Sequence, residues 1–307
     1  MRDLLLMPIR RIGRDLADAA RWWDRFWLAP QSPATACLLR WLAGAMFLYT
    51  HGVWSLALDE FFTSDGWQPA GLVEQLRAGT YHWSYWWSVP DEYIWPVHLA
   101  GLAVLFAFWI GWLTPVTSKL AAVIVISYAN RVPLANFGLD QINGMLALYL
   151  AIAPCGAMWS VDALWRRRPQ PTAAAGLAMR LIQVHLCLIY IYAGLAKLKG
   201  EAWWNGEAIW MTLANEEYQS LDLTWLAYAP RLTEALTHAT VLWELTFWAL
   251  VWRPRLRPYV LAIGTAMHLG IGAFLGMWTF GLIMTVAYVA FLPVDRLLYR
   301  TSTEAAS

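Results

Sequence analysis

The chain has 307 residues, of which 59% are hydrophobic and only 14% charged, and its mean hydropathy is +0.43. Soluble domains carry about 25% charged residues, so a water-soluble protein of this composition would have to expose large apolar surfaces. These values exclude a soluble enzyme and a disordered chain, and the net charge of only +1 excludes a nucleic-acid binder. They predict an all-α integral membrane protein.

The N-terminal segment, residues 1–35, is predicted to lie on the membrane surface. Residues 1–28 contain six arginines, with leucine, isoleucine, tryptophan and phenylalanine between them at helix-like spacing. The uninterrupted apolar stretch and the small-residue cleavage site of a secretory signal are missing. This pattern predicts an amphipathic interfacial helix, which Pro30 and Pro33 end.

Hydrophobic stretches recur between residues 36 and 293, and we expect this transmembrane domain to be a bundle of about eight spans. A membrane-spanning helix needs about 20 residues, with a range of about 17–25. The stretches lie near 36–57, 93–114, 118–130, 142–159, 178–197, 236–252, 258–275 and 277–293. Residues 294–307 are expected to form a cytoplasmic tail.

Lysine and arginine predict the orientation of the bundle. They collect in alternate connections, namely the N-terminal segment, the link with Lys119, residues 166–168, residues 253–257 and the tail. Short loops rich in these residues stay in the cytoplasm, so both termini are expected there. The two long loops, 58–92 and 198–235, are rich in acids, Trp and Tyr, and we expect both to face outward as a small cap.

Tryptophan and cysteine add two further expectations. The chain has 22 tryptophans, several of them in clusters such as Trp22-Trp23, Trp86-Trp87 and Trp203-Trp204. Such clusters fit membrane interfaces, because the ring is apolar but its N–H group needs a partner. Cys37, Cys155 and Cys187 form no CxxC pair, and no two histidines lie four residues apart in one predicted helix. We interpret the cysteines as small apolar residues and expect no metal site.

Lys197 ends the fifth predicted span and is a candidate functional residue. Tyr190 and Gln183 precede it at heptad spacing, so the three lie on one helical face as a polar stripe. The alternative is a lysine whose amine reaches the outer interface. The neighbouring Lys199 is better placed for that role, which favours an inward-facing Lys197.

Glu244 and His268 lie inside the sixth and seventh predicted spans, where ionisable groups are costly and usually face the bundle interior. Glu244 needs a buried partner or is protonated, and the candidate partners are Arg40, Lys197 and His268. The alternatives are a purely structural ion pair for Glu244 and a hydrogen-bonded packing role for His268.

The connection between the third and fourth spans is unusually polar. Its sequence, ANRVPLANFGLDQING, includes Asn130, Arg131, Asp140 and Gln141. So many polar groups at membrane depth predict a hydrated or ligand-lined pocket. In the expected orientation, five ionisable residues fall in the outer half of the membrane, with Glu244 about halfway down, and these five are His51, Arg131, Asp140, Lys197 and His268. We therefore predict one outward-opening cavity that they share with Glu244; the alternative is an exposed outer turn.

Several stretches resemble the horizontally transferred transmembrane domain (HTTM) family, the bacterial relatives of vitamin K-dependent gamma-carboxylase. They are LLRWLAGAMFLY, NRVPLANFGLDQINGMLALYLAIAPCGAMWSVDALW, YIYAGLAKLKGEAWWNGEA, WELTF and MHLGIGAFLGMWTFGLIM, spread over about residues 36–293. The most specific parts are Asp-Gln followed by Trp-Ser-Val-Asp, and Ala-Gly-x-x-Lys-Leu followed by Trp and Asn-Gly.

The resemblance implies a chemistry and roles for residues. In the carboxylase, a vitamin K hydroquinone is oxygenated to an epoxide, and the strong base so formed takes a proton from a glutamyl side chain, to which carbon dioxide adds. Lys197 occupies the position of the lysine thought to deprotonate the hydroquinone, and a lysine in a dry pocket can act as a base. His268 matches a histidine in a later span of the family, whereas Asp140 stands near the family's carbon dioxide histidine. We place Trp204, which follows the lysine motif, among the substrate-binding residues.

The first expectation is thus a hydroquinone epoxidase or carboxylase of the lyase class. It would use Lys197, His268 and Glu244 catalytically and a reduced vitamin K-type quinone as cofactor, in a bacterial inner membrane. The carboxylase has a large lumenal domain that binds its substrate's propeptide, whereas this chain ends soon after the last predicted span. Peptide recognition is therefore expected in the outer loops or in a partner subunit.

The alternative is a non-enzymatic subunit that binds, matures or gives immunity to a peptide or small protein. A third reading is a proton-coupled transporter with Glu244 and His268 as a relay, although no inverted repeat is visible in the sequence.

Overall fold

The computed structural model describes residues 2–165 and 169–295, and within these ranges the secondary-structure elements are all helices, with no strand. The side chains of residues 2–14 and of Ala70 are not described. Nearly all of the predicted cytoplasmic tail, from residue 296 on, and the arginines at 166–168 lie outside the described residues. The boundaries expected at residues 35 and 293 stay predictions.

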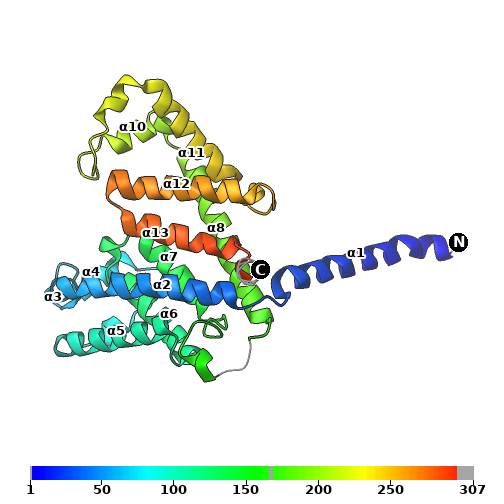
Figure 1. Ribbon diagram of the computed structural model, residues 1–307, viewed down its shortest axis with the longest axis horizontal. Coiled ribbons are helices and arrows are strands. Elements are labelled where there is room, and N and C mark those ends of the chain that lie inside the picture. The colour runs from blue at the N-terminus through cyan, green and yellow to red at the C-terminus, as the bar shows by residue number, and fades with distance from the viewer. Residues whose placement is uncertain (1, 166–168, 296–307) are drawn as a thin grey trace, which may run out of the picture.

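The helices follow one another along the chain (Figure 1). The α-helices are α1 (Arg2–Leu28), α2 (Ala34–Val53), α3 (Leu58–Phe62), α4 (Ala70–Leu76), α5 (Ile94–Ile110), α6 (Thr114–Arg131), α7 (Gly138–Leu150), α8 (Ala173–Lys197), α9 (Glu201–Trp204), α10 (Ala208–Leu213), α11 (Pro230–Leu250), α12 (Arg257–Leu275) and α13 (Trp278–Ala287). Short 3-10 helices are η1 (Trp54–Leu56), η2 (Tyr85–Ser88), η3 (Asp91–Tyr93), η4 (Pro133–Ala135), η5 (Asp162–Trp165), η6 (Thr224–Tyr228) and η7 (Tyr288–Phe291).

Proline and glycine set several of the helix ends. Pro230 opens α11, and Pro115 and Pro258 lie in the first turns of α6 and α12, where a missing N–H group costs nothing. Gly111 and Gly276 end α5 and α12 in the left-handed conformation, with φ of 78° and 71°. The fourth predicted span is helical only as far as Leu150, before Pro154.

Among the described residues, three helical segments are long and apolar enough to cross a membrane: Asp91–Ile110, Ala173–Lys197 and Arg257–Leu275. The segment Trp278–Phe291 is apolar but shorter. The all-helical fold is therefore confirmed, with three candidate spans. The larger number of eight and the layout of the loops stay predictions.

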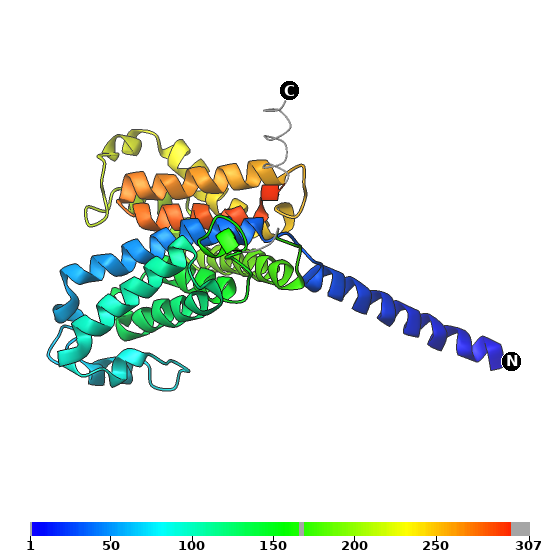
Figure 2. The same cartoon turned by 60° about the horizontal axis from the view of Figure 1, so that its bottom comes forward.

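The predicted N-terminal amphipathic segment contains a helix of 27 residues, α1, that points away from the rest of the protein (Figures 1 and 2). Its C-terminal end is tied to α8, because the guanidinium of Arg180 donates to the carbonyl oxygen of Phe26 at 3.1 Å and lies over its ring. Beyond α1, Gln31 and Thr172 exchange backbone hydrogen bonds. That α1 lies on a membrane stays a prediction.

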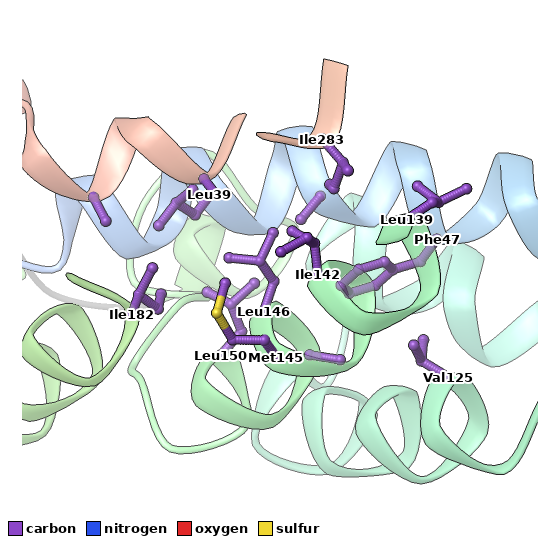
Figure 3. Packing of buried hydrophobic residues seen from close by; sticks show 14 of the residues in the cluster. Leu39, Phe47, Val125, Leu139, Ile142, Met145, Leu146, Leu150, Ile182 and Ile283 are labelled. Carbon is purple, nitrogen blue, oxygen red and sulfur yellow. The ribbon is translucent and has the colours of Figure 1, made fainter. Parts of the chain in front are cut away.

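The hydrophobic core surrounds α7, which packs against α2, α6, α8 and α13. Figure 3 shows some of the contributing side chains, which include Leu39 and Phe47 from α2, Val125 from α6, Leu139, Ile142, Met145, Leu146 and Leu150 from α7, Ile182 from α8 and Ile283 from α13. All are almost fully buried. Although α7 begins with the polar residues Asp140 and Gln141, it therefore lies at the centre of the packed helices.

Arg40 is fully buried in α2. Its guanidinium donates to the carbonyl oxygens of Cys155 at 3.0 Å and of Phe108 at 3.1 Å, and also to those of Trp109 and Trp159. These carbonyls lie at the end of α5 and in the segment after α7, where the regular helical hydrogen bonding stops and backbone groups need other partners. Arg40 is therefore a structural anchor and not the partner of Glu244.

The two long connections lie at one end of the helical body. In Figure 1, α3 and α4 of the first connection and α10 of the second lie to the left, whereas α1 leaves to the right. That the shared end faces outward stays a prediction.

Candidate functional site

A cavity of about 570 Å³ lies between α8, α11, α12 and α13, with α9, α10 and the start of α7 at its edge. Its walls are largely aliphatic and aromatic. Apolar side chains that line it include Ile142, Ile189, Ile209, Leu213, Leu236, Met267, Ile271, Phe274, Phe280 and Met284. Among the described lining residues, the charged ones are Lys197 and Glu244, so the cavity carries no net charge when they pair.

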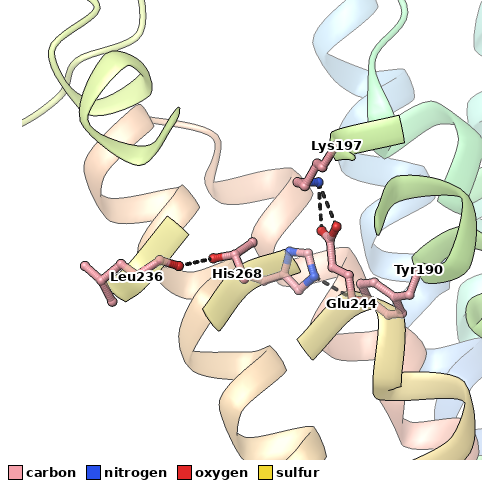
Figure 4. Close-up of polar contacts among 6 residues, drawn as sticks. Tyr190, Lys197, Leu236, Glu244 and His268 are labelled. Carbon is pink, nitrogen blue, oxygen red and sulfur yellow. Dashed lines mark hydrogen bonds and ion pairs between the residues drawn. The ribbon is translucent and has the colours of Figure 1, made fainter. Parts of the chain in front are cut away.

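Lys197 and Glu244 form an ion pair in this cavity (Figure 4). The Nζ atom of Lys197 lies 2.9 Å from Oε1 and 2.8 Å from Oε2 of Glu244. The carboxylate is 8% exposed and the lysine side chain 22%. Gly194 allows α8 and α11 to come close enough for this pair, because a Cβ atom at position 194 would lie only 2.8 Å from the side chain of Leu245. The last turn of α8 can therefore approach the middle of α11.

Trp203 completes the surroundings of the lysine. Nζ of Lys197 lies 5.1 Å from the centre of the Trp203 ring, which lines the cavity. Trp204, the residue expected from the sequence, is 63% exposed, and its Nε1–H donates to the carbonyl oxygen of Leu198. Successive residues on a helix point about 100° apart, and the lysine motif does not tell which of two adjacent tryptophans faces inward.

A buried hydrogen-bonded group lies beside the ion pair. The hydroxyl of Tyr190 lies 2.8 Å from Nε2 of His268 and also hydrogen-bonds the hydroxyl of Tyr288. His268 is only 4% exposed and lines the cavity, and its Nδ1 atom has no hydrogen-bond partner among the described residues. A buried nitrogen without a partner is costly, so this atom is available to a ligand. Tyr288 carried no signal in the sequence.

Glycines bring His268 into position. Gly281 of α13 lies against the backbone of His268, and a Cβ atom there would collide with its carbonyl group. Gly264 and Gly272, one turn on either side of His268, face Tyr288 and Trp278 just as closely. In this tight contact of α12 with α13, the imidazole packs edge-on against Phe280 of α13 and its Nε2 atom reaches the hydroxyl of Tyr190.

Gln183 and Gln141, two polar residues that stood out in the sequence, lie in different surroundings. The side-chain amide of Gln183 donates to the carbonyl oxygen of Ala290 at 2.6 Å, which ties α8 to η7 away from the cavity. Gln141, at the start of α7, lines the cavity. The stripe expected along α8 thus brings Tyr190 and Lys197 to the cavity and places Gln183 elsewhere.

Arg131 and Asn130 hold a connection in place and do not line the cavity. The guanidinium of Arg131 donates to the carbonyl oxygens of Gln68 at 2.7 Å and Phe62 at 2.8 Å. The side-chain amide of Asn130 donates to the carbonyl oxygen of Trp83 at 2.8 Å. Both residues therefore fasten the segment 58–92 to the end of α6.

His51 and Asp140 also lie apart from the cavity lining. Nδ1 of His51 lies 2.7 Å from the carbonyl oxygen of Phe47, and its ring meets Tyr128 edge-on. A carboxylate oxygen of Asp140 accepts the backbone N–H of Phe137 at 3.0 Å, which closes the first turn of α7. The predicted convergence of six residues thus divides, because Lys197, Glu244 and His268 share the cavity and Arg131, Asp140 and His51 do not.

Within the described residues, no three His, Cys, Asp or Glu side chains are arranged to hold a metal ion. The polar groups that line the cavity include an amine, a carboxylate, an imidazole, the phenol of Tyr190, the amide of Gln141 and two threonine hydroxyls. They can donate, accept and move protons around a mainly apolar ligand.

Comparison with known proteins finds one family. The family model described as HTTM domain matches residues 141–295, which include Lys197, Glu244 and His268. No curated protein and no solved structure shows a significant similarity to the chain.

Proposed function

Since the chain belongs to the HTTM domain family, we propose that it is a membrane enzyme acting on a lipid-soluble, quinol-like substrate, with Lys197 as the base. The observation that carries this proposal is the Lys197–Glu244 ion pair inside an otherwise apolar cavity. An ion pair in such surroundings adds little to stability compared with apolar residues, and titratable pairs in clefts are typical of sites that move protons.

The cavity suits a reduced naphthoquinone. Its volume of about 570 Å³ lies in the range of pockets that hold small ligands and cofactors. The apolar walls fit the fused rings, and the free Nδ1 of His268 can hydrogen-bond a ring oxygen. Such a molecule supplies two electrons and acidic hydroxyl protons for a reaction with oxygen.

Lys197 can serve as base only when its amine is neutral, and Glu244 makes this accessible. If the ammonium passes its proton to the carboxylate, a neutral amine and a neutral acid replace the ion pair without changing the charge of the cavity. The amine then accepts the proton of a substrate hydroxyl and becomes an ammonium beside the new substrate anion. Tyr190 holds His268 in place, so that its other nitrogen faces the substrate.

The test is a reaction of the purified, lipid-reconstituted protein with a reduced naphthoquinone and oxygen, in which quinone epoxide is quantified. Lys197→Ala is compared with Lys199→Ala, an exposed neighbour that does not line the cavity. We expect epoxide from the wild type and from Lys199→Ala and none from folded Lys197→Ala. Absence of both epoxide and quinone binding in the wild type would reject the proposal. Labelled carbon dioxide and a glutamyl peptide then test carboxylation as its narrower form.

A peptide-binding subunit is the second candidate, and one observation favours it. A cleft of about 580 Å³ beside α10 and α11 has two exposed carboxylates, Glu207 and Glu234, and the ring of Trp210 in its lining. These groups suit the cationic side chains of a peptide. Binding of a lysine-rich peptide that Glu207→Gln weakens and Lys197→Ala leaves unchanged would favour this function over the enzyme.

A further inference from the structure

The main cavity has a polar end and an apolar extension between α11 and α12. Lys197, Glu244 and His268 form the polar end. Along α11 the lining continues from Glu244 to Leu236, eight residues or about 12 Å toward the start of the helix. On α12 it continues to Phe274, close to the end of that antiparallel helix. We call the part lined by Leu236, Thr240, Ala266, Gly270 and Phe274 the α11–α12 slot.

The slot exists because α11 and α12 touch at one end and separate toward the other. Near their connection, Nε1–H of Trp243 donates to the carbonyl oxygen of Val260, and the indole fills the space beside Gly264. Farther along, α11 packs mainly on α8, and α12 packs mainly on α13. Figure 1 shows α11 leaving α12 at an angle. Leu236 and Phe274 are 44% and 38% exposed on the two sides of the opening.

The slot offers an apolar surface with spare room. The hydroxyl of Thr240 donates to the carbonyl oxygen of Leu236 at 2.8 Å, so its donor is used within α11. A Cβ atom at Gly270 would meet the ring of Phe274 at an ordinary 3.6 Å, whereas one at Gly264 would lie 2.5 Å from Tyr288. Close helix packing thus explains why a glycine is needed at position 264, but it gives no reason for a glycine at position 270.

We infer that the ligand is an uncharged amphiphile whose polar head reaches Lys197, Glu244 and His268 and whose long apolar chain leaves sideways through the α11–α12 slot. The inference rests on the proposed function for the head group. It adds the path by which the ligand's apolar chain leaves the cavity and the residues that contact that chain. A neutral head satisfies the free Nδ1 of His268 without adding charge to the paired cavity. Ala266 and Gly270 leave the room that the chain occupies, which makes Gly270 a specificity-determining position.

A chain leaving sideways can be told apart from one leaving past α10. Thr212 of α10 also lines the cavity, on the side of the predicted outer cap. Gly270→Trp would fill the slot, and Thr212→Trp would fill the other exit. Ile263→Trp is the matched control, because Ile263 is 54% exposed on α12 and does not line the cavity. Gly270→Leu serves as the milder variant if the tryptophan prevents folding.

The first probe is a long-chain primary alcohol with a photoreactive group in mid-chain, used on the protein in lipid nanodiscs. We expect crosslinks at residues 236–240 and 266–274 that Gly270→Trp reduces at least tenfold and that Ile263→Trp leaves unchanged. Crosslinks that Thr212→Trp removes and Gly270→Trp does not, or crosslinks spread over all exposed helices, would overturn the inference.

The second probe compares a naphthoquinone without a chain and one with a long prenyl chain, each measured by equilibrium binding. In Gly270→Trp, only the chain-bearing quinone should bind at least tenfold more weakly. An equal loss of affinity for both quinones, or no loss of affinity for either, would overturn the inference about the slot. Failure of the wild type to bind either quinone would instead reject the proposed function, while the alcohol still decides the slot.

Discussion

Nζ of Lys197 lies within 3 Å of both carboxylate oxygens of Glu244, 2.9 Å from Oε1 and 2.8 Å from Oε2. One partner ends α8 and the other lies in the middle of α11, 47 residues later. Each group can lose or gain its proton to the other without changing the net charge of the cavity. The pair is therefore a link between the end of α8 and the middle of α11.

Removing one member of this pair should destabilise the protein, and removing both should cost less than the sum. Lys197→Met leaves a carboxylate buried without its cation, at a cost of about 3 kcal/mol, near the low end for buried pairs because the lysine is partly exposed. Glu244→Leu should behave similarly. A double-mutant cycle of unfolding in detergent would then give a coupling of about 2 kcal/mol; additive effects would argue against a structural link.

Arg40→Met should be among the most destabilising single substitutions. It leaves the carbonyl groups of Cys155, Trp109 and Trp159 without this donor, and each buried unpaired group costs about 1–3 kcal/mol. The carbonyl oxygen of Phe108 keeps the backbone N–H of Gly111 as a donor. Arg40→Lys should rescue little, because an ammonium cannot reach all four oxygens. Thermal unfolding would be compared with Arg21→Met, whose side chain is exposed. Equal midpoints for the two Met variants would contradict the anchoring role.

Two glycines in neighbouring helices should respond oppositely to alanine. At Gly281 the new methyl group would collide with the backbone of His268, and overpacking costs about 1–3 kcal/mol. At Gly144 of α7 its nearest neighbour is a methylene of Ile126 at 3.9 Å, so alanine should stabilise the helix by about 0.5–1 kcal/mol. Unfolding midpoints of Gly281→Ala and Gly144→Ala should therefore move in opposite directions. The proposed site also predicts weaker quinone binding in Gly281→Ala alone.

Cysteine labelling tests the predicted orientation with little background, because Cys37, Cys155 and Cys187 are buried. In intact spheroplasts, Asp65→Cys and Glu216→Cys, both exposed in the long connections, should react with a membrane-impermeant maleimide. Arg255→Cys, exposed between α11 and α12, should react only after permeabilisation. The reverse pattern would invert the expected orientation.

Asp222 should give a local pH dependence in the second long connection. Hydrogen bonds from the side chain and backbone N–H of Thr224 lower the pKa of Asp222. Because the folded pKa is depressed, the contribution of this turn is present above the unfolded pKa and is lost as pH falls through the folded value. In ¹³C-carboxyl NMR, Thr224→Val should raise the pKa of Asp222 toward the ordinary value of an aspartate. An unchanged titration would show that the hydroxyl does not act on this carboxylate.

Local patterns were sufficient for the protein class, the family and several cavity residues. Lys197, Glu244 and His268 stood out because ionisable groups are rare in apolar helices, and the structure does bring all three to one cavity. The HTTM resemblance stated from motifs is confirmed by the family match. The all-helical fold could be predicted because apolar stretches about 20 residues long form helices in a membrane. Of the eight predicted spans, the described part of the chain shows three helices that are long and apolar enough to cross a membrane.

The sequence by itself determined that this is a helical membrane protein with a few ionisable side chains in apolar helices. Only the tertiary structure decided that Glu244 pairs with Lys197 while Arg40 binds backbone carbonyls, and that Trp203 rather than Trp204 lines the cavity. It also decided that Arg131 fastens a connection instead of joining the cavity. Hydropathy and spacing describe one helix at a time, whereas these pairings depend on how helices far apart in the chain cross and rotate against each other.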